Sequence, residues 1–176
     1  MCDAPAHAAG AQLAWLGYST TAGLPGWQQA AGSVLALALS MAPDVDNRNW
    51  WRKVDGWVPD EILGAQGPLR HRGITHFWGW PALLGYAAWA TPPSVAWVAW
   101  ALTIGWGSHL LMDFIFGIKP PGVPLLPWWG HVGLGLDSGG RFEYWVALPA
   151  LVAGSGWLAW GQVPWLRELL AGIGVG

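Results

Sequence analysis

Histidines and aspartates occur at four places in this sequence where their types and spacing could bind a metal ion. His71 and His76 lie five residues apart, at the point where a polar stretch turns into a long uncharged run. Imidazole is the commonest metal ligand in proteins. Three further clusters could join this pair, namely Asp44 with Asp46, His109 with Asp113, and His7. Their chemistry depends on whether the fold brings the four clusters together.

The spacing within each cluster restricts how it could act. His109 and Asp113 are four residues apart, so on a helix they point the same way and could share one metal or serve two neighbouring metals. His71 and His76 would diverge by about a third of a turn on one helix, so we expect His71 in the loop and His76 in the first helical turn. Asp44 and Asp46 could not share one helix face, so one of them could bind directly while the other orients an imidazole.

The composition indicates a membrane protein of one domain, residues 1–176. Hydrophobic residues make up 53% of the chain and charged residues only 10%, and 17 residues are tryptophan. Ordinary globular chains carry about 25% charged residues, and tryptophan gathers at bilayer interfaces. The net charge of -2 gives no reason to expect a nucleic-acid partner.

Breaks in the uncharged runs predict an all-α, integral membrane helical bundle with about five transmembrane helices. Residues 4–43 and 73–112 contain no charged residue, and Gly23-Leu24-Pro25-Gly26 and Pro92-Pro93 divide them. We expect the helices at about 7–23, 27–43, 74–90, 95–116 and 143–161. Between them lie an amphipathic surface loop at 44–72 and a Gly/Pro-rich loop at 117–142, and a short tail follows at 162–176.

Up-and-down threading of these helices would bring every candidate ligand to one membrane surface. The start of the first helix, the end of the second, the start of the third, the end of the fourth and the start of the fifth, which carries Glu143, all share that face. Seven of the eight basic residues fall there too, which makes it cytoplasmic by the positive-inside rule: Arg48, Arg52, Lys53, Arg70, Arg72, Lys119 and Arg141. We therefore expect a cytoplasmic N-terminus and an external C-terminus.

Mixed imidazole and carboxylate ligands suit Zn²⁺, and Mn²⁺ or Fe²⁺ are alternatives. One or more such ions would activate water and stabilise the oxygens of a phosphoester. Arg72 could neutralise a phosphate, and we expect Arg72 and Asp46 to take part in catalysis. Plainer interpretations stay open: the aspartates as solvated loop residues, His131 as a loop histidine, and Glu143 as a charge favoured at a helix N-terminus.

Four segments resemble the YdjM-type (YbcI-like) family of predicted bacterial and phage inner-membrane, metal-dependent hydrolases. In order they are Pro43-Asp44-Val45-Asp46, His71-Arg72-Gly73-Ile74-Thr75-His76, Ser108-His109-Leu110-Leu111-Met112-Asp113 and Gly122-Val123-Pro124-Leu125-Leu126-Pro127. The resemblance covers about residues 5–143. It implies a ligand set of His7, Asp44, Asp46, His71, His76, His109 and Asp113.

The family is distantly similar to zinc-dependent phospholipase C, which implies hydrolysis of a phosphoester or phospholipid. One position departs from the pattern, because many members have a histidine where this chain has Asn47. The alternative is a non-enzymatic metal-binding membrane protein, either a transporter or a phage membrane-remodelling factor. Transport would place ligands near the middle of the bilayer, whereas here they fall at helix ends. A soluble bundle with a Trp-rich core is a third interpretation.

Overall fold

A computed structural model describes residues 4–46, 74–116, 123–126, 129–134, 136 and 140–162. Within these ranges the chain is mainly helical, as predicted. The α-helices are α1 (Ala4–Thr21), α2 (Gly26–Met41), α5 (Gly79–Ala90), α6 (Pro93–Phe116) and α7 (Leu148–Gln162). Shorter turns adjoin them: the 3-10 turns η1 (Ala42–Asp46) and η3 (Ile74–His76), and the π-helical turn η4 (Glu143–Ala147).

Glycine and proline lie at the boundaries of the helices, close to where the sequence predicts these boundaries. Gly23 adopts a left-handed φ of 63° between α1 and α2, a conformation that glycine takes without steric penalty. Pro93 is the first residue of α6, a position where its missing N–H is not needed. Pro81 lies in the first turn of α5, so it starts this helix without kinking it.

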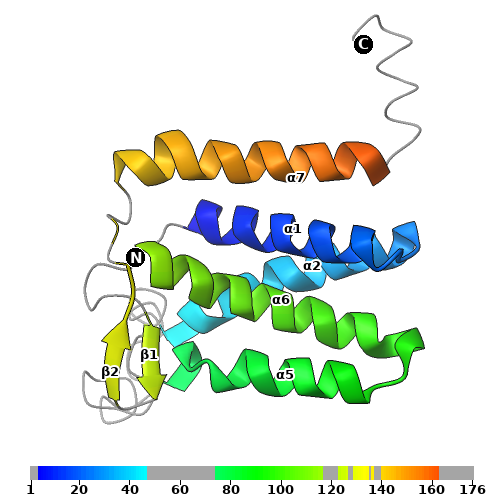
Figure 1. Ribbon diagram of the computed structural model, residues 1–176, viewed down its shortest axis with the longest axis horizontal. Helices are drawn as coiled ribbons and strands as arrows, with labels where there is room; N and C mark the ends of the chain where they lie inside the picture. The colour runs from blue at the N-terminus through cyan, green and yellow to red at the C-terminus, as the bar shows by residue number, and fades with distance from the viewer. Residues whose placement is uncertain are drawn as a thin grey trace, which may run out of the picture.

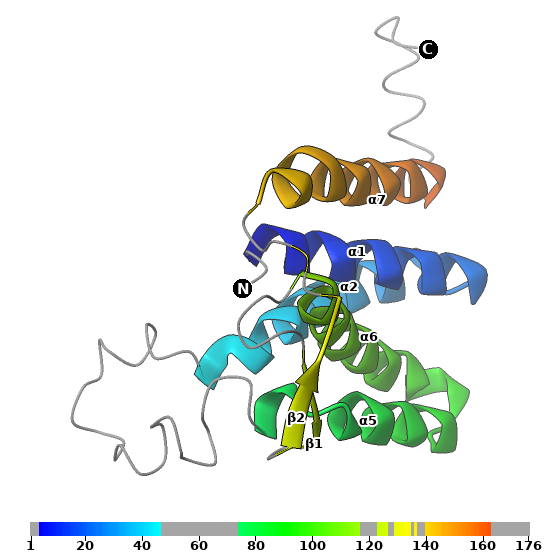
Figure 2. The same cartoon turned by 60° about the vertical axis from the view of Figure 1, so that its left-hand side comes forward.

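The helices lie side by side, with α1 and α6 in the middle of the bundle (Figure 1). Helix α6 packs against α1, α2 and α5, whereas α7 packs against α1. Two apolar clusters join them, one around Trp15, Ala36 and Ala101 and the other around Ala6, Met112 and Phe116. Figure 2 shows α5 and α7 on opposite sides of this arrangement.

Small residues let α2 approach its neighbours closely. A Cβ atom built on Gly105 of α6 would lie 2.9 Å from the Cα of Ala36, and one on Gly32 would enter the indole ring of Trp15. The indole N–H of Trp15 donates to the carbonyl of Gln29 at 2.8 Å. Contacts of this kind are typical of helices packed in membranes.

A short β-hairpin, which we did not expect from the sequence, occupies part of the predicted loop 117–142. Strands β1 (Val123–Leu126) and β2 (Trp129–Val132) pair antiparallel, with Val123 opposite Val132. After the hairpin, the N–H of Leu134 donates to the carbonyl of Phe114 at 2.7 Å, and that of Leu136 to the carbonyl of Ile115. The segment thereby satisfies two of the carbonyls that the end of α6 leaves without a helical partner.

Among the described residues, only α6 is both long and apolar enough to cross a membrane by itself. It has 24 residues, and the mean hydropathy of its qualifying window is 1.3. Helices α2, α5 and α7 have 16, 12 and 15 residues, fewer than the roughly 20 that a bilayer requires. The five predicted helices therefore form, but five transmembrane spans are not confirmed.

Candidate metal centre

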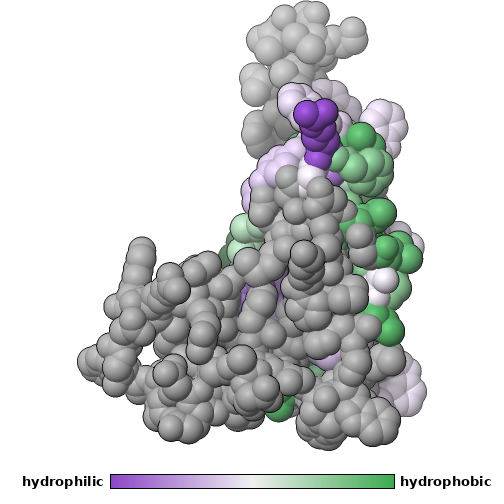
Figure 3. All heavy atoms as spheres, turned by 90° about the vertical axis from the view of Figure 1, so that its left-hand side faces the viewer, coloured by the Kyte–Doolittle hydropathy of each residue, from purple (hydrophilic) through white to green (hydrophobic). Residues whose placement is uncertain are grey.

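Five of the predicted ligands meet at one end of the bundle. They are His7 in the first turn of α1, Asp44 in η1, His76 in η3, and His109 and Asp113 near the end of α6. The helix ends that carry them lie at the left of Figure 1, beside the β-hairpin. Figure 3 looks directly onto this end of the molecule, where apolar side chains of the described residues follow one edge.

Four donor atoms form the centre of this cluster. The Nε2 atoms of His76 and His109 are 3.2 Å apart. Asp113 Oδ2 lies 3.3 Å from His76 Nε2 and 3.7 Å from His109 Nε2. Asp44 Oδ1 lies 3.7 Å from each of the same two nitrogens. Each of the two carboxylates thus lies close to the same pair of imidazole nitrogens.

The backbone of α2 fixes the tautomer of His109. Its Nδ1 atom lies 2.6 Å from the carbonyl oxygen of Ser40. Because a carbonyl only accepts hydrogen bonds, Nδ1 carries the proton, and in the neutral ring Nε2 presents its lone pair to the centre. A second partner of this kind is the usual companion of a metal-binding histidine.

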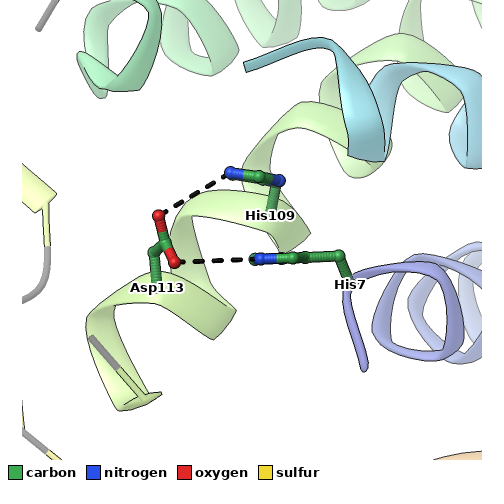
Figure 4. A group of neighbouring side chains, drawn as sticks. All are labelled: His7, His109 and Asp113. Atoms are coloured by element: carbon green, nitrogen blue, oxygen red, sulfur yellow. Dashed lines mark ion pairs between the residues drawn. The ribbon is translucent and has the colours of Figure 1, made fainter. Parts of the chain in front are cut away.

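His7 lies beside the four donors instead of among them. Its ring stacks on that of His109, with centroids 3.9 Å apart and planes at 11°. Figure 4 shows the carboxylate of Asp113 beside the two imidazoles, with one oxygen directed at each ring, and its Oδ1 atom is 3.8 Å from His7 Nε2. The side chain of His7 is 1% exposed, and neither ring nitrogen has a hydrogen-bond partner among the described residues.

Two groups of donors could each hold an ion, one of Asp44, His76 and His109 and the other of His7, His109 and Asp113. Both use His109. Because the Ser40 carbonyl engages Nδ1 of His109, only Nε2 is left for a metal. The imidazole of His109 can therefore serve one ion of a pair, and not both.

Asp44 is the only one of these four ligands whose side chain is partly exposed. Its side chain is 20% exposed, whereas His76, His109 and Asp113 are almost fully buried. Burial by itself would raise the pKa of the Asp44 carboxyl, but the hydrogen bond with His76 and the nearby imidazoles of His109 and His7 outweigh it and hold this pKa below its usual value. Asp44 therefore stays ionised at neutral pH, as a metal ligand must.

Glu143 is a buried acid at the same end of the molecule. It is 1% exposed, begins the π-helical turn η4, and lies close enough to His7 to act on it electrostatically. The N–H of Leu148 donates to its carbonyl, as a π-helix requires; such turns are frequent at functional sites. From the sequence we expected Glu143 on the same side as the ligands. Its local sequence does not distinguish a buried acid from an exposed charge at a helix N-terminus.

The remaining predicted residues are not placed. Asp46 ends η1, but its side chain lies outside what the structure describes. His71, Arg72 and Asn47 fall in the undescribed range 47–73. Their predicted roles stay predictions.

Comparison with known proteins identifies the family. Residues 2–174 match the family described as YdjM inner membrane protein. The chain belongs to this family. The resemblance drawn from the four segments is thereby confirmed, and the family's description makes the chain an inner membrane protein. No matching curated protein and no matching solved structure were found, so the similarity to zinc-dependent phospholipase C stays a prediction.

Proposed function

We propose that this YdjM-family chain is a membrane-embedded, metal-dependent hydrolase whose ion is held by Asp44, His76, His109 and Asp113. The spacing of the four donors carries this proposal. Donors placed tetrahedrally at the usual Zn–N and Zn–O lengths stand about 3.3 Å apart. Five of the six separations among these four donors run from 3.2 to 3.7 Å, and Asp44, His76 and His109 form one group whose ligand atoms lie close enough to hold an ion.

The protonation states of the same groups also favour a cation at the centre. Two carboxylates and the lone pair of His109 Nε2 are all acceptors, and only His76 has a proton to offer among the four. Buried acceptors that face each other without a compensating positive charge are strongly unfavourable. A divalent ion would satisfy all four groups together, and imidazole with carboxylate suits Zn²⁺, Mn²⁺ or Fe²⁺.

A bound divalent ion would supply Lewis-acid activation of water for the hydrolysis of a phosphoester. The protein's own contribution is to hold the donors in place and to leave one side open. Asp44 is the most exposed of the four donors, so substrate and water would approach past its carboxylate. A phospholipid is the phosphoester that an inner membrane protein meets in its own bilayer.

The exposed surface supports insertion of the whole bundle into the membrane. Large apolar side chains face outward along α2, α5, η4 and α7, and extended apolar surfaces mark contact with lipid or another protein. Examples are Trp27 and Val34, Leu83 and Trp89, and Trp145 and Trp157, which are between 57% and 80% exposed. In our proposal the short helices cross together with α6, with the metal centre at the cytoplasmic face.

A second candidate function is a metal site that only stabilises the fold of a non-enzymatic membrane protein. Its support is that four protein donors would be enough to complete the shell of a zinc ion, and that three of the four are buried. Structural zinc sites are closed in this way, whereas catalytic sites keep a position for water.

Metal analysis of the full-length protein in detergent is the first test. We expect about one equivalent of zinc, manganese or iron in the wild type and a large loss in His109→Ala, whereas His131→Ala, a histidine outside the predicted ligand set, should keep its metal. The loaded wild type is then assayed on phosphodiester and phospholipid substrates. Turnover that His109→Ala loses supports the hydrolase. Stoichiometric metal without turnover, but with a raised unfolding temperature, supports the structural site. Equally low metal in all three proteins contradicts both.

A further inference from the structure

Two tryptophan side chains hold the turn that presents His76. The turn η3 has only three residues, Ile74–His76, and no α-helix includes it. The indole N–H of Trp80 donates to the carbonyl of Ile74 at 2.6 Å, and that of Trp106 donates to the carbonyl of Thr75 at 3.0 Å. The two carbonyls immediately before His76 are thus both fixed by indoles.

The bond from Trp106 joins two ligands that are far apart in sequence. Trp106 lies on α6 three residues before His109, so both side chains project from similar faces of that helix. Its indole reaches back 31 residues to the backbone next to His76. The bond therefore sets the position of η3 relative to α6, and with it the 3.2 Å separation between the Nε2 atoms of His76 and His109.

The hydroxyl of Thr75 completes this support. Its Oγ1 atom lies 3.0 Å from His76 Nδ1, where it can hold the ring with Nε2 directed at the centre. A short backbone turn alone leaves an imidazole free to rotate about two torsions. The indole bonds hold the backbone, and the hydroxyl contact orients the ring.

We propose that Trp106, with Trp80 and Thr75, is a positioning residue that holds His76 in register with His109 for metal binding. This inference rests on the proposed metal-binding function. It assigns a structural task at the site to two of the 17 tryptophans. Loss of such an outer partner typically lowers metal affinity 10- to 100-fold.

The test compares Trp106→Phe with Trp100→Phe in the full-length protein in detergent. Both residues are half-buried on α6, but Trp100 packs against Tyr18 in the cluster around Trp15, away from the site. Affinities for Zn²⁺ and Co²⁺ are measured by competition with a chelator, and the visible spectrum of bound Co²⁺ reports the ligand geometry. We expect Trp106→Phe to weaken binding 10- to 100-fold and to change the cobalt spectrum, and Trp100→Phe to leave both unchanged.

Thr75→Val and Thr75→Ser provide a second measurement that does not remove a large side chain. Valine should weaken metal binding, and serine, which keeps the hydroxyl, should restore most of it. Wild-type affinity and spectrum in both Trp106→Phe and Thr75→Val would overturn the positioning role while leaving the metal site standing. A wild-type protein that takes up no ion would overturn the proposed function, and the positioning role with it.

Discussion

The crossing of α2 and α6 should be sensitive to a single added methyl group. Gly105 lies against the backbone of Ala36, and a Cβ atom there would be 2.9 Å from Cα and 3.0 Å from the carbonyl carbon of Ala36, and closer still to its oxygen. Ordinary contact begins at 3.4 Å, so in Gly105→Ala the helices must separate by about 0.5 Å to relieve the contact with Cα alone, and by more to relieve the contact with the oxygen. Backbone atoms cannot rotate away as a flexible side chain can.

The expected change in the free energy of unfolding follows from two opposing effects. Inserting a methyl group into a tightly packed contact costs about 1–3 kcal/mol, whereas replacing glycine by alanine inside a helix gains up to roughly 1 kcal/mol. Gly156→Ala on α7 is the matched control, because nothing lies within 4 Å of a Cβ atom at that position. The control should show only the gain, so Gly105→Ala should be about 1–3 kcal/mol less stable than Gly156→Ala.

Gly105→Ala should also weaken metal binding. Ser40 and His109 each lie four residues, about one turn, beyond the crossing of Ala36 with Gly105, and the bond between them is 2.6 Å long. Separation at the crossing stretches this bond and weakens metal binding. Unfolding followed by circular dichroism in mixed micelles gives the stability, and chelator competition gives the affinity. If Gly105→Ala matches Gly156→Ala in both quantities, the helix crossing does not support the site as described.

Further substitutions separate the roles of the individual residues. His76→Ala should abolish stoichiometric metal binding, whereas His7→Ala, which removes the ring stacked on His109, should weaken it only about tenfold; equal losses in chelator competition would contradict this ranking. Asp44→Asn keeps the size of the side chain but removes an ionised ligand, so it should weaken metal binding, and an unchanged affinity would exclude Asp44 from the ligand set. A topology reporter fused at Gly176 should report an external C-terminus, and a cytoplasmic signal would reverse the proposed orientation.

The helices, and the gathering of the ligands at one end of the bundle, could be predicted because both depend on local sequence features. Gly23 and the pair Pro92-Pro93 mark the turns, and antiparallel neighbours bring alternate ends together whatever their side chains. Five of the predicted ligands met for this reason. The i, i+4 spacing of His109 and Asp113 likewise depends only on helix geometry.

The features that the sequence did not predict depend on contacts between distant segments. The β-hairpin forms where Val123 and its neighbours pair with Val132 and its neighbours, beside the last carbonyls of α6. The burial of Glu143 depends on the packing of α7 against α1. The bond of Trp106 depends on the packing of η3 against α6, because nothing in its local sequence points to the carbonyl of Thr75.

Anomalous scattering from a zinc- or cobalt-loaded crystal of the full-length protein would locate the ion among its ligands. We expect one peak per chain that lies about 2 Å from His76 Nε2, His109 Nε2 and one oxygen each of Asp44 and Asp113. A peak held by other residues, or no peak among these four donors at saturating metal, would contradict it.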